Sequence, residues 1–212
     1  MSLRYTGERI PSETDPVTQT RCPWSLGVDD AYQRYHDEEW GVPVRDDAKH
    51  FEFLLLESAQ AGLSWATVLR KREGYRRAFA NFDAERVARF NSRSIERLVN
   101  DARIIRNRQK IVAAINNARE FLKIQEEFGG FDQYVWGFVG GQPVRNRFKK
   151  QSDIPATSAE SDALSKDLKS RGFSFVGSTI IYAHMQATGL VNDHIVDCFR
   201  YDACLKLAGS GR

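Results

Sequence analysis

The sequence lacks the features that would assign it to a specialised class. It has three cysteines among 212 residues, an odd number that is too small for a disulfide framework, so we expect free thiols in a reducing cytoplasm. No apolar run approaches the ~18 residues of a membrane-spanning helix, and the polar N-terminus has no apolar stretch typical of a signal peptide. A net charge of only +3 does not predict nucleic-acid binding, which would need a local basic patch.

The length and the hydrophobic periodicity indicate one all-α domain. The chain is long enough for a single sizeable core, and apolar residues recur at helical spacing, as in Ile111, Ile115, Ala118 and Leu122. No convincing alternating strand is present, and residues 140–156 form a basic loop. We expect a disordered tail over residues 1–20, one domain over 21–204 and a second tail over 205–212.

Capping residues predict where the helices begin and end. Starts are expected at Asp46–Asp47, Ser64, Asp83, Ser92 or Ser94, Thr157 with Glu160, Ser178 and Asn192, with a stop at Gly172. The helix that begins after Ser64 is expected to run towards Phe79.

Cysteine and histidine occur in pairs near both ends of the sequence. Cys22 and His36 lie near the start, and His194 and Cys198 lie near the end at i, i+4 spacing. A helix capped by Asn192 would place the second pair on one face. Two thiolates and two imidazoles are a common structural zinc set, but the spacing matches no standard zinc finger. The local sequence alone favours the other interpretation, in which Cys198 is a small core residue and His194 a hydrogen-bonded core histidine.

The first pair is also compatible with a zinc-dependent deaminase, because His36-Asp37-Glu38 has the H-x-E pattern of those enzymes. That chemistry also requires a C-x-x-C motif, which the sequence does not contain. We therefore set this reading aside, and we interpret Cys204 as structural.

One carboxylate lies in an unusually apolar helix. Glu57 follows Phe53-Leu54-Leu55-Leu56, and at about 100° per residue it points roughly 140° away from Glu52. The two carboxylates therefore cannot share one narrow solvated stripe. A carboxylate among apolar neighbours needs a partner, so Glu57 lies at a rim, in a buried ion pair, or in a pocket for a polar or cationic ligand.

Aromatic residues flank Glu57 in the sequence, namely Trp24, Tyr32, Tyr35, Trp40 and Trp65. Each alone is typical of a hydrophobic core. Together with one carboxylate, flat aromatic faces would suit a flat cationic ligand.

A short break joins two amphipathic helices around residues 100–107. Four cations lie within eight residues there: Arg103, Arg106, Arg108 and Lys110. Free N–H groups at the start of the second helix favour phosphate, although a solvated basic face would show the same pattern. No glycine occupies the turn, which weakens the phosphate reading.

Taken together, these segments resemble the 3-methyladenine DNA glycosylase I family of the helix-hairpin-helix glycosylase superfamily. The resemblance is carried, in order from Arg21 to Tyr201, by RCPW, YHDEEWGVP, LES-AQAGLSW-TVL, FD, IIRNRQKI, SDALSKDLKSRGFSFVGST and GLVNDH. It implies a two-lobed all-α fold with the base pocket between the lobes. It also implies a structural zinc on Cys22, His36, His194 and Cys198.

The resemblance further implies an activity and its site. The expected enzyme flips an N3-alkylated purine out of double-stranded DNA and hydrolyses its N-glycosidic bond, releasing free 3-methyladenine. Glu57 would bind the base and act as the catalytic residue, with Tyr35, Trp24, Trp65 and Tyr32 around the base. No lysine stands at the hairpin position of the lyase-type relatives, so we expect a monofunctional hydrolase. We also expect a monomer.

The sequence departs from the family pattern in three places. Arg103 replaces the usual hairpin glycine, Ser58-Ala59 replaces a more polar pair, and one residue is inserted between Trp24 and Tyr32. Two other classes remain open from sequence, namely a non-catalytic reader of alkylated DNA and a zinc-stabilised scaffold without a DNA role.

Overall fold

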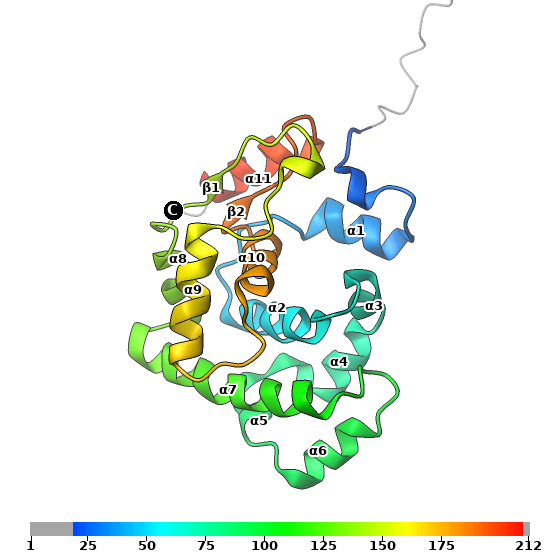
Figure 1. Cartoon of the computed structure of the whole chain (residues 1–212), viewed down its shortest axis with the longest axis vertical. Helices are drawn as coiled ribbons and strands as arrows, with labels where there is room; N and C mark the ends of the chain where they lie inside the picture. Colours follow the sequence, from blue (N-terminus) through cyan, green and yellow to red (C-terminus); the bar gives the residue numbers. More distant parts are fainter. Residues whose placement is uncertain (1–18, 210–212) are drawn as a thin grey trace, which may run out of the picture.

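The computed structural model describes residues 19–209, so most of the expected N-terminal tail lies outside the described residues. Within that part the protein is built of α-helices (Figure 1), which confirms the predicted fold class. The helices are α1 Asp30–Glu38, α2 Asp47–Gln60, α3 Trp65–Arg70, α4 Arg72–Ala78, α5 Ala84–Ala88, α6 Ser92–Val99, α7 Arg108–Phe128, α8 Phe131–Gly137, α9 Ala159–Ser170, α10 Ser178–Ala187 and α11 Phe199–Gly209. Three short 3-10 turns cover Pro23–Ser25, Ala80–Phe82 and Gln151–Asp153.

Two very short strands were not predicted. β1 Val144–Arg145 pairs in parallel with β2 Val191–Asn192, and this pair joins the predicted basic loop to the C-terminal segment. Strands of two residues are too short to produce an alternating sequence pattern. No helix in the described range is long and apolar enough to cross a membrane.

α2 runs through the middle of the molecule, with α4–α7 on one side and α10 and the strands on the other (Figure 1). Its residues Phe51, Leu54 and Leu56 are at most 1% exposed and belong to the main core. They share this core with Ile111 of α7 and Ile181 of α10. Burial on nearly every face explains the uninterrupted apolar run Phe53–Leu56 of α2, and it places Glu57 in the interior.

Three predicted helix starts are confirmed by cap hydrogen bonds. The side chains of Asp46, Ser64 and Asp83 each accept from backbone N–H groups of the following turn. The helix after Ser64 does not continue to Phe79, because the backbone leaves helical geometry at Lys71 (ψ 0°), where α3 ends and α4 begins. The predicted stop near Gly172 is confirmed, since α9 ends at Ser170 and Gly172 has a φ of +96°.

Other predicted caps are wrong by small shifts. The capping box of α9 is formed by Ser158 with Ser161 instead of Thr157 with Glu160. Before α6 the capping side chain is Asn91. Gly177 occupies the N-cap of α10, and the Ser178 hydroxyl donates to Asp162 instead of capping.

The prediction at Asn192 fails for a different reason. Asn192 lies in β2, and its side-chain amide donates to the Tyr201 carbonyl at 2.9 Å. The last helix starts later, at Phe199, and continues to Gly209. Residues 205–209 therefore extend this helix and do not form a tail.

Candidate active site and metal cluster

A pocket of about 390 Å³ opens beside α1, α2, α3 and α10. All five residues predicted to surround the base line it: Trp24, Tyr32, Tyr35, Glu57 and Trp65. Trp40 lines it too. Sequence reasoning missed the remaining lining residues, Gln60, Gln151, Ile154, Pro155, Ala183 and Gln186. These come largely from the basic loop and from α10, which no local pattern connects to Glu57.

The aromatic side chains pack against one another around the pocket. Trp24 meets Tyr32 edge-on with ring centres 5.5 Å apart, and it meets Trp40 at 5.0 Å. Tyr35 lies 5.4 Å from Trp65. These contacts join the turn before α1 to α3 and hold rigid π faces around the cavity, as recognition of a flat ring requires.

Glu57 is the buried carboxyl group of this pocket. Its side chain is 3% exposed and has no hydrogen bond or ion pair to any residue between 19 and 209. Burial raises the pKa of Glu57 to about 8, because a charged carboxylate is poorly solvated in an apolar site. Tyr32 and Tyr35 line the same pocket. Burial raises the pKa of both phenols, and the negative charge of Glu57 raises it further. Glu57 therefore keeps its proton to a higher pH than an exposed carboxyl group does.

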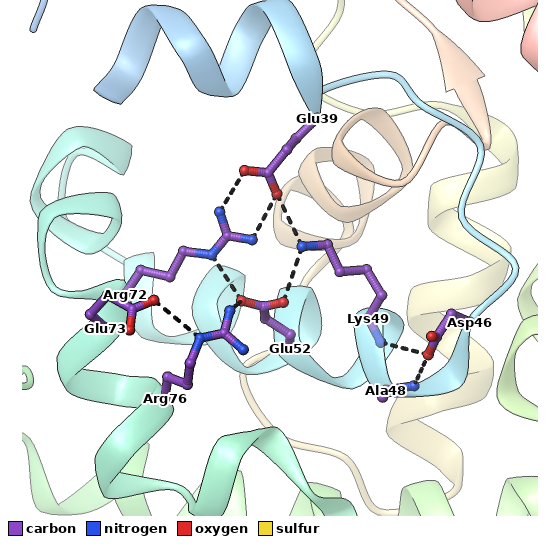
Figure 2. Close-up of polar contacts among 8 residues, drawn as sticks. All are labelled: Glu39, Asp46, Ala48, Lys49, Glu52, Arg72, Glu73 and Arg76. Carbon is purple, nitrogen blue, oxygen red and sulfur yellow. Dashed lines mark hydrogen bonds and ion pairs between the residues drawn. The ribbon is translucent and has the colours of Figure 1, made fainter. Parts of the chain in front are cut away.

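Glu52, five residues earlier on α2, shows the opposite arrangement (Figure 2). It accepts from Arg72 and Arg76 at 2.8 Å and from Lys49 at 3.1 Å. Burial alone would raise the pKa of Glu52, but these cationic partners outweigh burial and lower it. The predicted separation of the two carboxylates is thus confirmed, with Glu52 in an ion-pair network and Glu57 in a pocket.

A larger cavity of about 560 Å³ borders this ion-pair network. Its charged side chains bind one another, for example Arg72 to Glu39 through two hydrogen bonds of 2.7 Å. The cavity around Glu57 has an unpaired carboxyl group instead, so we place the candidate active site there in spite of its smaller volume.

Cys22, His36, His194 and Cys198 converge at a second site. All four are buried, and one ligand atom from each lies within 4.8 Å of the others. Sulfur and nitrogen are separated by 3.5 Å in three pairs, namely Cys22 with His194, Cys198 with His36, and Cys198 with His194. A tetrahedron with metal–sulfur bonds of about 2.3 Å and metal–nitrogen bonds of about 2.0–2.1 Å has nearly this edge.

The route by which His194 and Cys198 meet differs from the prediction. Residues 193–198 are not helical, and the Cys198 N–H instead donates to the Ile195 carbonyl at 2.8 Å in a turn before α11. This turn brings together the two side chains that the predicted helix would have aligned.

Outer hydrogen bonds orient both imidazole rings. His36 Nδ1 lies 2.8 Å from the Asp37 carboxylate, and His194 Nε2 lies 3.0 Å from the Trp40 carbonyl. Because these oxygens accept hydrogen bonds, each ring directs an N–H outward and its other nitrogen towards the cysteines. Such contacts typically support metal-binding histidines, so the four residues fit a metal ion by donor type, spacing and orientation.

The predicted phosphate-binding turn lies between α6 and α7. Arg103 pairs with Asp101 at 2.8 Å, and Arg108 pairs with Glu96 at 2.6 Å. Arg106 is exposed and has no ion pair within the described part of the chain. Arg103 is not among the residues with positive φ, so this turn does not require the family glycine.

Lys110 does not extend the basic surface. Its ammonium group donates to the carbonyls of Ala59 and Ala61 at 2.8 and 2.6 Å. These carbonyls lie at the C-terminal end of α2, where the helix leaves acceptors without partners. We therefore correct the predicted role of Lys110 from DNA contact to a link between α2 and α7.

A family model described as methyladenine glycosylase matches residues 24–201. The chain belongs to the methyladenine glycosylase family. The match covers the pocket, the turn between α6 and α7 and three of the four converging Cys/His residues, and it confirms the resemblance and the expected enzyme class.

Individual relatives agree with this assignment. DNA-3-methyladenine glycosylase 1 of Escherichia coli (strain K12) is 52% identical over 181 residues, which are 85% of this chain and 96% of that protein. A crystal structure of 3-methyladenine DNA glycosylase I matches with a TM-score of 0.82 at 50% identity, over 85% of this chain and 98% of the other. A variant of 3-methyladenine DNA glycosylase I in complex with 3-methyladenine matches with a TM-score of 0.82 at 37% identity, over 84% and 96% of the two chains.

Proposed function

We propose that this protein is a monofunctional DNA repair glycosylase that hydrolyses the N-glycosidic bond of 3-methyladenine in double-stranded DNA. The observation that carries the proposal is the unpaired, buried carboxyl group of Glu57 in an aromatic pocket. The relative in complex with 3-methyladenine supports the choice of base. The base must leave the duplex to reach such a pocket, which costs a few kcal/mol.

Glu57 provides the selectivity for an alkylated base. Methylation at N3 makes the adenine of the nucleotide formally cationic, whereas ordinary adenine is neutral. The cation attracts the carboxylate form of Glu57, so binding releases the proton held at a pKa of about 8. The surrounding π faces add cation–π attraction of about 2 kcal/mol when desolvated. Neutral adenine gains less from both interactions.

The chemical step then needs little from the protein. Water attacks C1′ of the sugar, the bond to the base breaks, and the bonding electrons neutralise the departing 3-methyladenine. One proton of the water passes to solvent. Among residues 19–209, no lysine lines the pocket as a lyase nucleophile, and the Lys110 ammonium is engaged by two carbonyl oxygens. A hydrolase without lyase activity follows.

The direct test of this activity is incubation of the purified protein with N-methylated duplex DNA, with chromatography of the released bases. We expect 3-methyladenine to be released and the DNA strand to remain uncleaved. Binding of methylated DNA without base release would support a non-catalytic reader, and absence of DNA binding would support a scaffold protein.

The Cys/His cluster would hold one structural zinc ion. Zinc favours this set of two thiolates and two imidazoles, and the four ligands leave no open position for substrate. Cys22 and His36 lie near one end of the domain and His194 and Cys198 near the other, so the ion would join the two ends. When bound, zinc contributes its binding free energy to folding.

The turn between α6 and α7 is the proposed phosphate contact. At the start of α7, the backbone N–H groups of Arg106, Arg108 and Gln109 have no partner within residues 19–209, whereas those of Arg103 and Ile105 are satisfied by Asp101 and Tyr75. This concentrates the available donors at the N-terminus of a 21-residue helix, where the helix dipole favours anions.

Charge reversal at this turn should weaken binding of all duplex DNA alike. We expect Arg106→Glu to reduce the slope of log K against log salt by about one phosphate contact, while free 3-methyladenine binds as before. Lys166→Glu is the matched control, because Lys166 is exposed and belongs to α9, a helix that lies away from the turn between α6 and α7 (Figure 1). Equal salt slopes for both variants would show that the phosphate contact lies elsewhere, and the basic loop 140–156 would be the next candidate.

A further inference from the structure

A glutamine at the end of α10 lines the pocket beside the aromatic residues. Gln186 reaches the cavity, and its side-chain nitrogen Nε2 donates to the Asp193 carboxylate at 2.8 Å. Its backbone carbonyl accepts from the Gly41 N–H at 3.1 Å. Both ends of the residue are therefore anchored, and the amide has a defined position in the pocket wall.

Asp193 fixes which way that amide faces. This carboxyl group is 1% exposed and also accepts from the Tyr182 hydroxyl at 2.7 Å and from Asn146 Nδ2 at 2.6 Å. An ionised carboxylate can only accept, so the glutamine must present its nitrogen to Asp193. The alternative amide orientation would place two oxygens against each other. The orientation thus follows from the hydrogen-bond network.

The carbonyl oxygen Oε1 of Gln186 is left for a ligand. It has no hydrogen bond to any other residue in the described range, and the side chain is only partly buried. An amide oxygen accepts N–H or O–H donors. Glu57, the other acceptor of interest in this pocket, also lacks a protein partner. Glu57 and Gln186 therefore offer the pocket one ionisable acceptor and one permanently neutral acceptor, and the orientation of the neutral one is fixed by Asp193.

We propose that Gln186 determines specificity by accepting a hydrogen bond from the exocyclic amino group of the flipped base. The inference rests on the proposed function and adds to Glu57 a second residue that recognises the base. An amino group has two hydrogens, so one can bind Glu57 and the other Gln186. A base with a carbonyl in place of the amine would place an oxygen against Oε1, which leaves a buried acceptor without a donor.

Binding of free bases to Gln186→Met tests this inference. Methionine keeps the length of the side chain but removes the acceptor. We expect affinity for 3-methyladenine, measured by calorimetry, to fall roughly five- to tenfold, as for loss of one hydrogen bond. Affinity for 3-methylpurine, which lacks the amino group, should change by less than about twofold, since it makes no such bond. Equal losses for the two bases would overturn the proposal.

Two further variants separate recognition from structural support. Asn146→Ala removes another donor from Asp193 but does not line the pocket, so its preference for 3-methyladenine over 3-methylpurine should match that of wild type. Gln186→Glu should largely restore the preference, because two adjacent carboxyl groups share one proton and an acceptor oxygen remains towards the base. Two results would contradict the role of Oε1. One is a loss of the preference for 3-methyladenine in Asn146→Ala, and the other is a preference in Gln186→Glu that is as low as in Gln186→Met.

Failure of this inference is distinguishable from failure of the proposed function. Wild-type protein that releases 3-methyladenine from DNA, together with a Gln186→Met variant of unchanged preference, overturns only the role of Gln186. Wild-type protein that neither binds the free base nor releases it from DNA overturns both.

Discussion

Glu57→Gln should lower kcat/KM for release of 3-methyladenine from duplex DNA by roughly 100- to 1000-fold, the usual effect of removing one preorganised electrostatic contact. The amide still offers an oxygen to the amino group of the base but cannot balance its positive charge. Selectivity over neutral bases should fall with activity. The measurement is single-turnover base release, compared with release of a neutral alkylated base from the same duplex.

The same substitution should leave the fold intact and increase its stability at neutral pH. A carboxyl group whose folded pKa is about 8 holds its proton in the native state while the unfolded chain loses it above about pH 4.5. Stability from this group is therefore full at low pH and is lost as pH rises towards 8. The amide of the variant does not titrate and has no such loss, so the variant should be more stable at pH 7 by up to roughly 3 kcal/mol.

Glu52→Gln is the matched control for position in the helix. Glu52 lies on the same helix but is held by Arg72, Arg76 and Lys49 (Figure 2). Its replacement should reduce stability, because the paired cations lose a buried partner, and should leave base selectivity unchanged. If Glu57→Gln binds and releases the cationic base as well as wild type does, the electrostatic argument is wrong.

Cys198→Ala should reduce the free energy of unfolding by roughly 3–5 kcal/mol through loss of the metal. Purified wild-type protein from metal-replete growth should contain about one zinc per chain by elemental analysis, and the variant should contain far less. A chelator should lower the Tm of wild type towards that of the variant and leave the variant unchanged.

Cys204→Ala is the control for a buried thiol outside the cluster. Cys204 is 2% exposed and is not one of the four converging residues. Its loss should cost only the packing of one small side chain, about 1 kcal/mol, with zinc content unchanged. Wild-type protein with well below one equivalent of zinc, or equal losses in the two variants, would contradict a structural metal site.

Site residues could be predicted from the sequence where a residue type is unusual among its neighbours in the chain. Glu57 stands out because a carboxylate interrupts an apolar helix. The spacing of the Cys/His pairs matches no standard zinc finger, so the zinc ligand set followed only from the family resemblance. Helix starts at Asp46, Ser64 and Asp83 were predictable because each cap is a local hydrogen bond.

Other parts depend on contacts that no local pattern encodes. Gln186 resembles any polar residue near a helix end, and only the fold brings Asp193 and the pocket to it. Lys110 belongs to a basic cluster in sequence, yet the end of α2 captures its ammonium group. The turn that aligns His194 with Cys198 likewise forms through tertiary contacts with His36 and Trp40.

The pH dependence of base release tests the central claim most directly, namely that Glu57 recognises the cationic base as a carboxylate. The 3-methyladenine nucleotide in DNA stays cationic throughout, so the profile reports the free enzyme. With a Glu57 pKa of about 8, kcat/KM should rise about tenfold per pH unit below that value and level off above it, and Glu57→Gln should give a flat profile. A flat wild-type profile between pH 6 and 9, or a sloped profile that persists in the variant, would contradict the account.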